Sequence, residues 1–163
     1  AEHAKVLEIG SAVGFLAGHC ANIRPDLRLY LHEDNPGLRQ MLAVVCTLSN
    51  RAFNEKFVLL KQELGQDPAA GALAMIAAVR PDALLLSDPQ LDGKALQNLL
   101  SRLKTFAPAQ IFVYGRLLER YHADLPAIEA QLAALGYVPD YGFDANIARG
   151  FRLTGTVGSG TTS

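Results

Sequence analysis

Residues 5–15 read KVLEIGSAVGF. A short apolar run ends at Gly10, and from Ala12 onward the apolar residues recur at helical spacing. A strand that passes through a glycine turn directly into a helix is the opening of a βαβ unit. This stretch therefore predicts an α/β fold, with the glycine turn at the carboxyl end of a buried strand.

The alternation of strand and helix continues along the rest of the chain. Capping residues followed by proline, at Asn35-Pro36 and Asp67-Pro68, mark two helix starts, and Gly136 marks a helix end. The expected strands cover residues 5–9, 27–32, 57–60, 83–86, 111–114, 137–141 and 150–155. This order predicts a doubly wound, mostly parallel Rossmann-like sheet of about seven strands with helices on both faces. The last two strands lie too close together for an intervening helix, so we expect an antiparallel edge hairpin.

The composition excludes several classes of protein. Of the 163 residues, 50% are hydrophobic and 19% are charged, which excludes a disordered chain. The net charge is −1 and no long basic run occurs, so we expect neither nucleic acid nor an anionic membrane as partner. No apolar run approaches the roughly 20 residues that span a bilayer, and no signal peptide is visible. The cytoplasm is the expected location.

The chain is expected to form one domain over residues 1–155. Residues 156–163 are rich in glycine, serine and threonine and are expected to form a flexible tail. The early start of the first strand suggests a domain taken from a larger chain. Cys20 and Cys46 are far apart and the four histidines show no ligand spacing, so we expect free thiols and no metal site.

Glu8, Gly10 and Gly14 form the pattern E-x-G-x-x-x-G between the first strand and the first helix. Gly10 permits a tight turn, and the free amides of the helix start favour an anion. The second strand ends in Glu33, about twenty residues further on, where an acidic side chain holds a ribose. Ala12 occupies the place where dinucleotide sites have a glycine that admits pyrophosphate, so a nucleoside without pyrophosphate fits better.

Residues 6–15, VLEIGSAVGF, resemble motif I of S-adenosylmethionine-dependent methyltransferases of class I, and most closely that of the FkbM-type group. Residues 31–36, LHEDNP, are similar to the step after the second strand in that group, with Glu33 on its acid and Asn35-Pro36 on its final pair. The resemblance extends over residues 5–155, but only the first forty residues or so carry specific motifs.

This resemblance implies S-adenosylmethionine as cofactor and a small molecule or glycan hydroxyl as methyl acceptor. The residues of the turn would line the amino-acid and ribose portion of the cofactor, and Phe15 would be a nearby wall. Glu33 would hold the ribose hydroxyls, and Glu8 would face the methionine amino group, directly or through water. The predicted cofactor-binding residues are Glu8, Gly10, Ser11, Gly14, Phe15 and Glu33.

The resemblance also implies a catalytic residue. Asp88 ends the fourth strand, where the group has an aspartate near the transferred methyl. A hydroxyl acceptor gains from a general base, for which Asp88 is the first candidate, and His122 and Asp92 are weaker ones.

The chain departs from the group around that aspartate. The group usually has a lysine before it and an E-G pair after it, whereas this chain has Leu86-Ser87 and Pro89-Gln90-Leu91. The fifth strand ends in Tyr114-Gly115, where an acid is common. Cofactor binding is therefore better supported than turnover.

Simpler interpretations of the same residues remain open. Gly10 and Gly14 could serve strand-to-helix packing, Glu33 could be a solvated strand end, and Asp88-Pro89 is a common turn opener. Tyr114 could line a pocket or pack in the core.

Three functions remain at this point: an O-methyltransferase, a non-catalytic methyltransferase-like module that binds cofactor weakly or supports a partner domain, and a nucleotide-linked oxidoreductase. The glycine spacing argues against the last.

Overall fold

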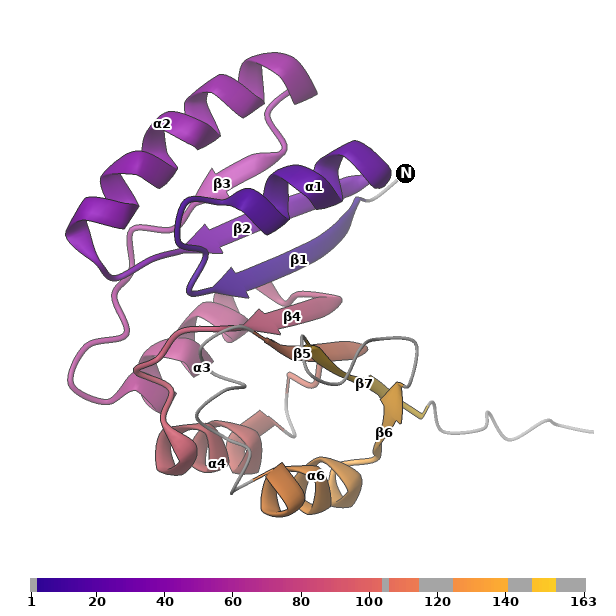
Figure 1. Cartoon of the computed structure of the whole chain (residues 1–163). Helices are drawn as coiled ribbons and strands as arrows, with labels where there is room; N and C mark the ends of the chain where they lie inside the picture. Colours follow the sequence, from indigo (N-terminus) through magenta and orange to yellow (C-terminus); the bar gives the residue numbers. More distant parts are fainter. Residues whose placement is uncertain (1–2, 104–105, 115–124, 141–147, 155–163) are drawn as a thin grey trace, which may run out of the picture.

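The computed structural model describes residues 3–103, 106–114, 125–140 and 148–154, in which strands alternate with helices (Figure 1). His122 and the tail predicted over residues 156–163 lie outside these ranges. The strands are β1 (Ala4–Ile9), β2 (Leu27–His32), β3 (Phe57–Leu59), β4 (Ala83–Leu86), β5 (Gln110–Tyr114), β6 (Tyr137–Asp140) and β7 (Ala148–Leu153). The helices are α1 (Phe15–Ile23), α2 (Pro36–Phe53), α3 (Pro68–Val79), α4 (Gly93–Arg102) and α6 (Leu125–Ala134).

The strands form one seven-stranded sheet in the order β3-β2-β1-β4-β5-β7-β6. The first five strands are parallel, whereas β7 runs antiparallel to both β5 and β6. The predicted doubly wound, mostly parallel fold with an antiparallel hairpin is therefore confirmed. Only β6 lies at that edge of the sheet, because β7 is inserted between β5 and β6.

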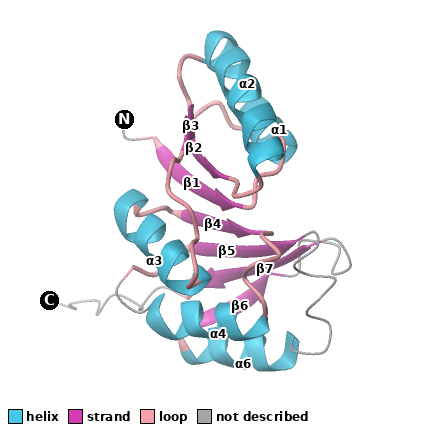
Figure 2. Ribbon diagram, turned by 90° about the vertical axis from the view of Figure 1, so that its left-hand side faces the viewer, coloured by secondary structure: helices cyan, strands magenta, loops and turns pink. Residues whose placement is uncertain are grey.

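Helices cover both faces of the sheet, with α1 and α2 on one side and α3, α4 and α6 on the other (Figure 2). Alternate strand residues contribute to the two cores, as the period of two requires. Leu7 and Ile9 of β1 pack with α3, α4 and α6, whereas Val6 packs with α1 and α2. Glu8 is two residues after Val6 in the strand, so both side chains point to the same face of the sheet, the one covered by α1.

Helix capping occurs where the sequence predicts it. The Asn35 carboxamide oxygen accepts hydrogen bonds from the Gly37 and Leu38 amides at 3.0 and 3.2 Å, and the Asp67 carboxylate accepts one from the Ala70 amide at 3.1 Å. Helix α1 differs because its N-cap is Gly14, which has no side chain to offer to the first helical amides. Among the described residues no side chain caps the amino end of α1, so its first backbone amides are candidate donors beside the carboxyl end of β1.

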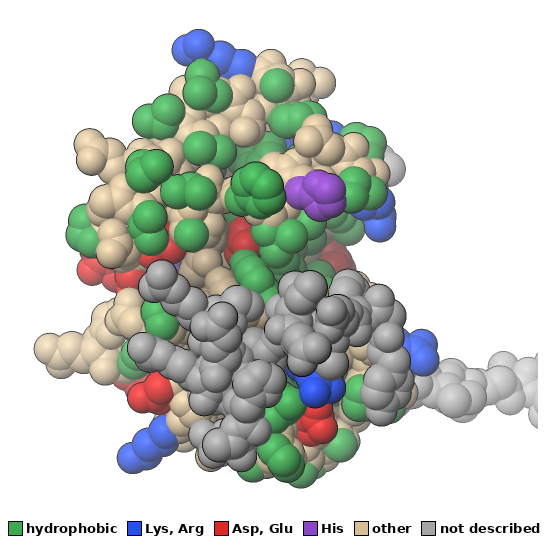
Figure 3. Space-filling view, in the orientation of Figure 1, with side chains coloured by type: hydrophobic (Ala, Val, Ile, Leu, Met, Phe, Trp, Pro, Cys, Tyr) green, Lys and Arg blue, Asp and Glu red, His purple; other side chains and the backbone are tan. Residues whose placement is uncertain are grey.

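The α1 face of the sheet carries an apolar groove and exposed apolar side chains. An apolar groove of about 490 Å³ lies over β1, β4 and β5, and Leu16, Leu85, Phe112 and Tyr114 are among the residues that line it. Figure 3 shows hydrophobic side chains gathered over α1 and α2, and the exposed ones are Phe15, Ile23, Met41, Val44 and Leu48. Among the described helices, none is both long and apolar enough to cross a bilayer.

Candidate functional site

The candidate site lies where β1, β2 and β4 end side by side. Ile9, the last residue of β1, pairs with His32 of β2 on one side and with Leu86 of β4 on the other. The segments that follow these strands therefore meet at one edge of the sheet. Ligands of open α/β sheets bind at such an edge, beside the strand at which the strand order reverses, which here is β1.

The turn after β1 has an unusual backbone. Gly10, Ala12 and Gly14 all have positive φ angles, of 92°, 49° and 76°. The Gly10 and Ser11 amides both donate to the His32 carbonyl oxygen, at 3.0 and 2.8 Å, which ties the turn to the end of β2. This conformation is unfavourable for a residue with a side chain such as Ala12, so the contacts around the turn must hold it in place.

Gly10 is required for a second reason. A Cβ atom at this position would lie 2.5 Å from the Asp88 amide nitrogen and 2.7 Å from its Cα. The turn after β1 and the segment after β4 therefore touch through their backbones. The absence of a side chain at Gly10 thus permits a close approach of the two backbones as well as the tight turn.

The Glu33 side chain stabilises the turn after β1 by hydrogen bonds. Its Oε2 accepts a hydrogen bond from the Ala12 amide and its Oε1 accepts one from the Asn35 amide, both at 2.8 Å. The residue is 7% exposed. Each carboxylate oxygen has a second lone pair, so ribose hydroxyls can still donate to Glu33. The pattern that predicts a ribose contact thus also identifies the side chain that holds the turn in shape.

Glu8 is the most unusual ionisable residue of the site. It is 2% exposed, its Oε1 accepts a hydrogen bond from the Tyr114 hydroxyl, and its Oε2 has no partner among the described residues. Burial raises the pKa of Glu8 to about 7, against the lowering effect of the hydrogen bond from the Tyr114 hydroxyl. A buried carboxylate oxygen without a donor is costly, and it is a candidate contact for a cationic ligand group.

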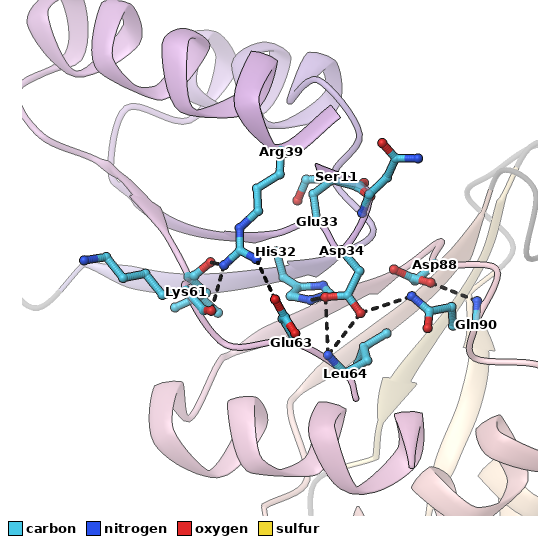
Figure 4. Close-up of polar contacts among 12 residues, drawn as sticks. Ser11, His32, Glu33, Asp34, Arg39, Lys61, Glu63, Leu64, Asp88 and Gln90 are labelled. Carbon is cyan, nitrogen blue, oxygen red and sulfur yellow. Dashed lines mark hydrogen bonds and ion pairs between the residues drawn. The ribbon is translucent and has the colours of Figure 1, made fainter. Parts of the chain in front are cut away.

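A second polar cluster lies at the end of β2, and Figure 4 shows it around the Asp34 carboxylate. His32 is fully buried and its Nε2 lies 2.8 Å from Asp34 Oδ1. Asp34 also accepts from the Leu64 amide at 3.1 Å and from the Gln90 side chain at 3.0 Å. This cluster joins the ends of β2 and β4 to the segment before α3. No local pattern in the sequence predicts these contacts, and the polar residues beside Glu33 are the only signal of them that it offers.

Asp88 lies at the site but is enclosed. It is 2% exposed, and its Oδ1 accepts from the Gln90 amide at 2.8 Å. Burial is the main cause that raises the pKa of Asp88, and nearby Glu33 and Asp34 add to it. The turn-opening interpretation of Asp88-Pro89 therefore describes the geometry that is present. A role as base would require the carboxylate to become accessible.

The remaining candidates differ in their exposure. Phe15 is 86% exposed at the first position of α1. Ser11 is buried and donates from its hydroxyl to the Glu8 carbonyl oxygen at 3.2 Å. Asp92 caps α4 through the Ala95 amide at 2.9 Å. In the part of the chain that the structure describes, no group of acidic, histidine and cysteine side chains is arranged to hold a metal ion.

Comparison with known proteins gives matches by structure alone. No family model and no curated protein matches the sequence. Magnesium protoporphyrin IX methyltransferase from Synechocystis PCC 6803, solved with bound S-adenosylmethionine, matches with a TM-score of 0.62 at 13% identity, over 93% of this chain and 71% of that one. The chain shares its fold with class I methyltransferases.

Two further structures agree. Precorrin-6y C5,15-methyltransferase from Geobacter metallireducens GS-15 matches with a TM-score of 0.59 at 14% identity, over 85% of this chain and 66% of that chain. The fibrillarin pre-rRNA processing protein of Methanococcus jannaschii matches with a TM-score of 0.65 at 16% identity, over 95% of this chain and 68% of that one. The chain thus spans about two thirds of the length of these proteins.

Proposed function

We propose that this chain binds S-adenosylmethionine at the carboxyl ends of β1 and β2 and transfers its methyl group to a hydroxyl of a small molecule or glycan. The observation that carries the proposal is the Glu8 Oε2 atom, which is buried without a hydrogen-bond partner among the described residues, on the strand that leads into the turn held by Glu33. The methyltransferase fold of the structural neighbours supports it, and the FkbM-type group remains the group that the motifs favour.

The donors and acceptors of the site fit the parts of this cofactor. The amides at the amino end of α1 suit its carboxylate. Glu8 Oε2 suits its ammonium group, provided that the carboxylate becomes accessible, because Glu8 is 2% exposed, as Asp88 is. The second lone pairs of Glu33 suit the ribose hydroxyls. The ligand groups that match these positions are therefore an amino acid and a ribose in one molecule.

The sheet order disfavours a dinucleotide. The dinucleotide-binding order is 3-2-1-4-5-6, whereas this sheet places the antiparallel β7 between β5 and β6. Ala12 stands where a dinucleotide site has its middle glycine, and its amide is already bonded to Glu33. Both observations agree with a nucleoside without pyrophosphate.

When bound, the cofactor supplies an activated methyl group on a sulfonium sulfur, so alignment with the acceptor provides much of the acceleration. The residues around the turn hold the cofactor, and a hydroxyl acceptor additionally needs a group that takes its proton. Asp88 is the nearest candidate for that group. The Asp88 carboxylate must rotate away from the Gln90 amide before it can reach a methyl acceptor.

The enclosure of Asp88 favours a second candidate function. A chain that binds cofactor but presents no accessible base would act as a non-catalytic methyltransferase-like module. Two observations favour this non-catalytic role: Asp88 is 2% exposed, and its carboxylate accepts a hydrogen bond from the Gln90 amide.

Calorimetry with S-adenosylmethionine, S-adenosylhomocysteine and NAD tests the cofactor. We expect binding of both adenosyl ligands and no heat with NAD. Binding of NAD alone would identify a nucleotide-linked oxidoreductase, and the absence of binding to all three would contradict the proposal.

The variant Asp88→Asn tests turnover. Asparagine keeps the oxygen that accepts from the Gln90 amide but cannot take a proton, so we expect methyl transfer to fall by about 10²-fold or more with cofactor affinity unchanged. The measurement is formation of S-adenosylhomocysteine with a panel of hydroxylated small molecules and oligosaccharides. Asp67→Asn is the matched control, because asparagine still caps α3. Equal rates in Asp88→Asn and the unmodified chain would remove Asp88 as base.

A further inference from the structure

The Glu8 carboxylate is held from one side only. Its Oε1 accepts from the Tyr114 hydroxyl, which comes from β5, 106 residues further along the chain. Its Oε2 is buried and has no partner among the described residues. A carboxylate with one oxygen fixed and the other free has a defined direction in which it can accept a ligand donor.

Tyr114 is well placed to give Glu8 that direction. Its ring forms part of the wall of the apolar groove over β1, β4 and β5, so packing restricts the ring while the hydroxyl reaches Glu8. The hydroxyl of Ser87, which also interacts with Tyr114, donates to the Gly10 carbonyl oxygen at 2.6 Å. The phenol is thus connected to the same turn that the cofactor would contact.

We propose that Tyr114 is a positioning residue for cofactor binding: its hydroxyl holds Glu8 Oε1 so that Oε2 stays free for the ammonium group of the ligand. This inference rests on the proposed function. It assigns Tyr114 a role through Glu8, without direct contact between Tyr114 and the ligand.

The charges around Glu8 determine how this role depends on pH. Among the described residues, Tyr114 from β5, Cys20 from α1 and Glu33 after β2 are the titratable groups coupled to it. Burial raises the pKa of Glu8 to about 7, and the Tyr114 hydrogen bond opposes that rise. An ammonium group binds the carboxylate form, so affinity should fall about tenfold per pH unit below that pKa and level off above it.

Tyr114→Phe removes the hydroxyl and keeps the ring in the groove. The pKa of Glu8 should then rise further, because the bond that favours its charged form is lost. We expect roughly fivefold weaker binding of S-adenosylhomocysteine near pH 7, and a shift of the pH profile upward by about one unit. Calorimetry between about pH 6 and pH 8.5 measures both, and a carbon NMR titration of the Glu8 carboxyl in the ligand-free protein measures the same shift independently.

Tyr137→Phe is the matched control. Tyr137 is buried and its hydroxyl donates to the Pro108 carbonyl oxygen at 2.6 Å, so this variant also loses a buried hydrogen bond. Affinity and pH profile should stay as in the unmodified chain. A merely structural role of Tyr114 would give a uniform loss of affinity with an unshifted profile, and that result would overturn the inference.

The outcomes separate this inference from the proposed function. If the unmodified chain binds S-adenosylhomocysteine and the Tyr114→Phe profile is unshifted, the positioning role is wrong and the proposed function stands. If the unmodified chain binds no adenosyl ligand, the proposed function fails and the inference fails with it. A shifted profile together with an upward shift in the Glu8 titration supports both.

Discussion

Glu8 is a single residue whose ionisation the fold makes costly. Strand β1 is at the centre of the sheet, and its alternation directs Glu8 to the α1 face, where it is 2% exposed. Water is replaced there by apolar neighbours and by the Tyr114 hydroxyl, whose hydrogen bond only partly stabilises the charged form of the carboxylate. In the ligand-free protein the charged form of Glu8 is therefore destabilised, and a cationic ligand group would offset this cost.

This cost predicts a pH-dependent stability. The pKa of Glu8 is about 7 in the folded chain and 4.5 as the ordinary value, so the folded state holds its proton more tightly. Protonated Glu8 therefore adds up to about 3 kcal/mol to the free energy of unfolding. This contribution is complete below about pH 4.5 and is lost as the pH rises through about 7. Urea unfolding of the unmodified chain and of Glu8→Gln across this range measures it. The difference between the two proteins isolates Glu8 from Asp88, and pH curves that run parallel would contradict the prediction.

Helix α3 shows how the packing of an element sets the position of a loop. Gly71 lies against the segment before the helix, and a Cβ there would be 2.3 Å from the Leu64 carbonyl oxygen and 2.6 Å from its Cα. The same Leu64 donates its amide to Asp34, at the end of β2. Close packing at Gly71 therefore determines how near the loop comes to the candidate site.

Two helical glycines give a matched test of this packing. Gly71→Ala should destabilise the chain by about 1–3 kcal/mol, because the added methyl group meets backbone that cannot move aside. Gly18→Ala, in α1, meets nothing within 4 Å and should stabilise the chain by about 0.5–1 kcal/mol through helix propensity. Urea denaturation measures both free energies. A stabilising effect of similar size in both variants would show that Gly71 is not packed in this way.

For the whole molecule, the order of the strands determines which parts are most protected. Strands β1 and β4 are central and contribute fully buried side chains such as Leu7, Ile9, Leu84 and Leu86. Strands β3 and β6 lie at the two edges and have three and four residues. Edge strands are paired on one side only, so they can open without unfolding the centre of the sheet.

Hydrogen exchange tests this arrangement. Amides of β1 and β4 should exchange only through global unfolding, whereas those of β3 and β6 should exchange faster, through local opening. Gly71→Ala should lower the free energy of unfolding and so speed exchange in β1 and β4. The change in free energy calculated from these exchange rates should equal the change measured by urea unfolding. Protection of β6 equal to that of β4 would contradict the assigned sheet order.

Much of the fold and part of the site follow from the sequence, because the signals act over a few residues. The apolar alternation predicts the strands, the Asn35-Pro36 and Asp67-Pro68 pairs predict two helix starts, and the glycine turn predicts the place of the site. Glu33 belongs to this group as well, since its spacing from the turn depends only on the length of one βαβ unit.

Other features depend on residues that only the folded sheet brings together. The Tyr114 hydroxyl reaches Glu8 from 106 residues away, and the insertion of β7 between β5 and β6 has no local signal. The enclosure of Asp88 and the 86% exposure of Phe15 likewise depend on how neighbouring segments pack. Local patterns specify turns, caps and strand faces, whereas the burial and partner of a side chain depend on which strands are adjacent and in which register.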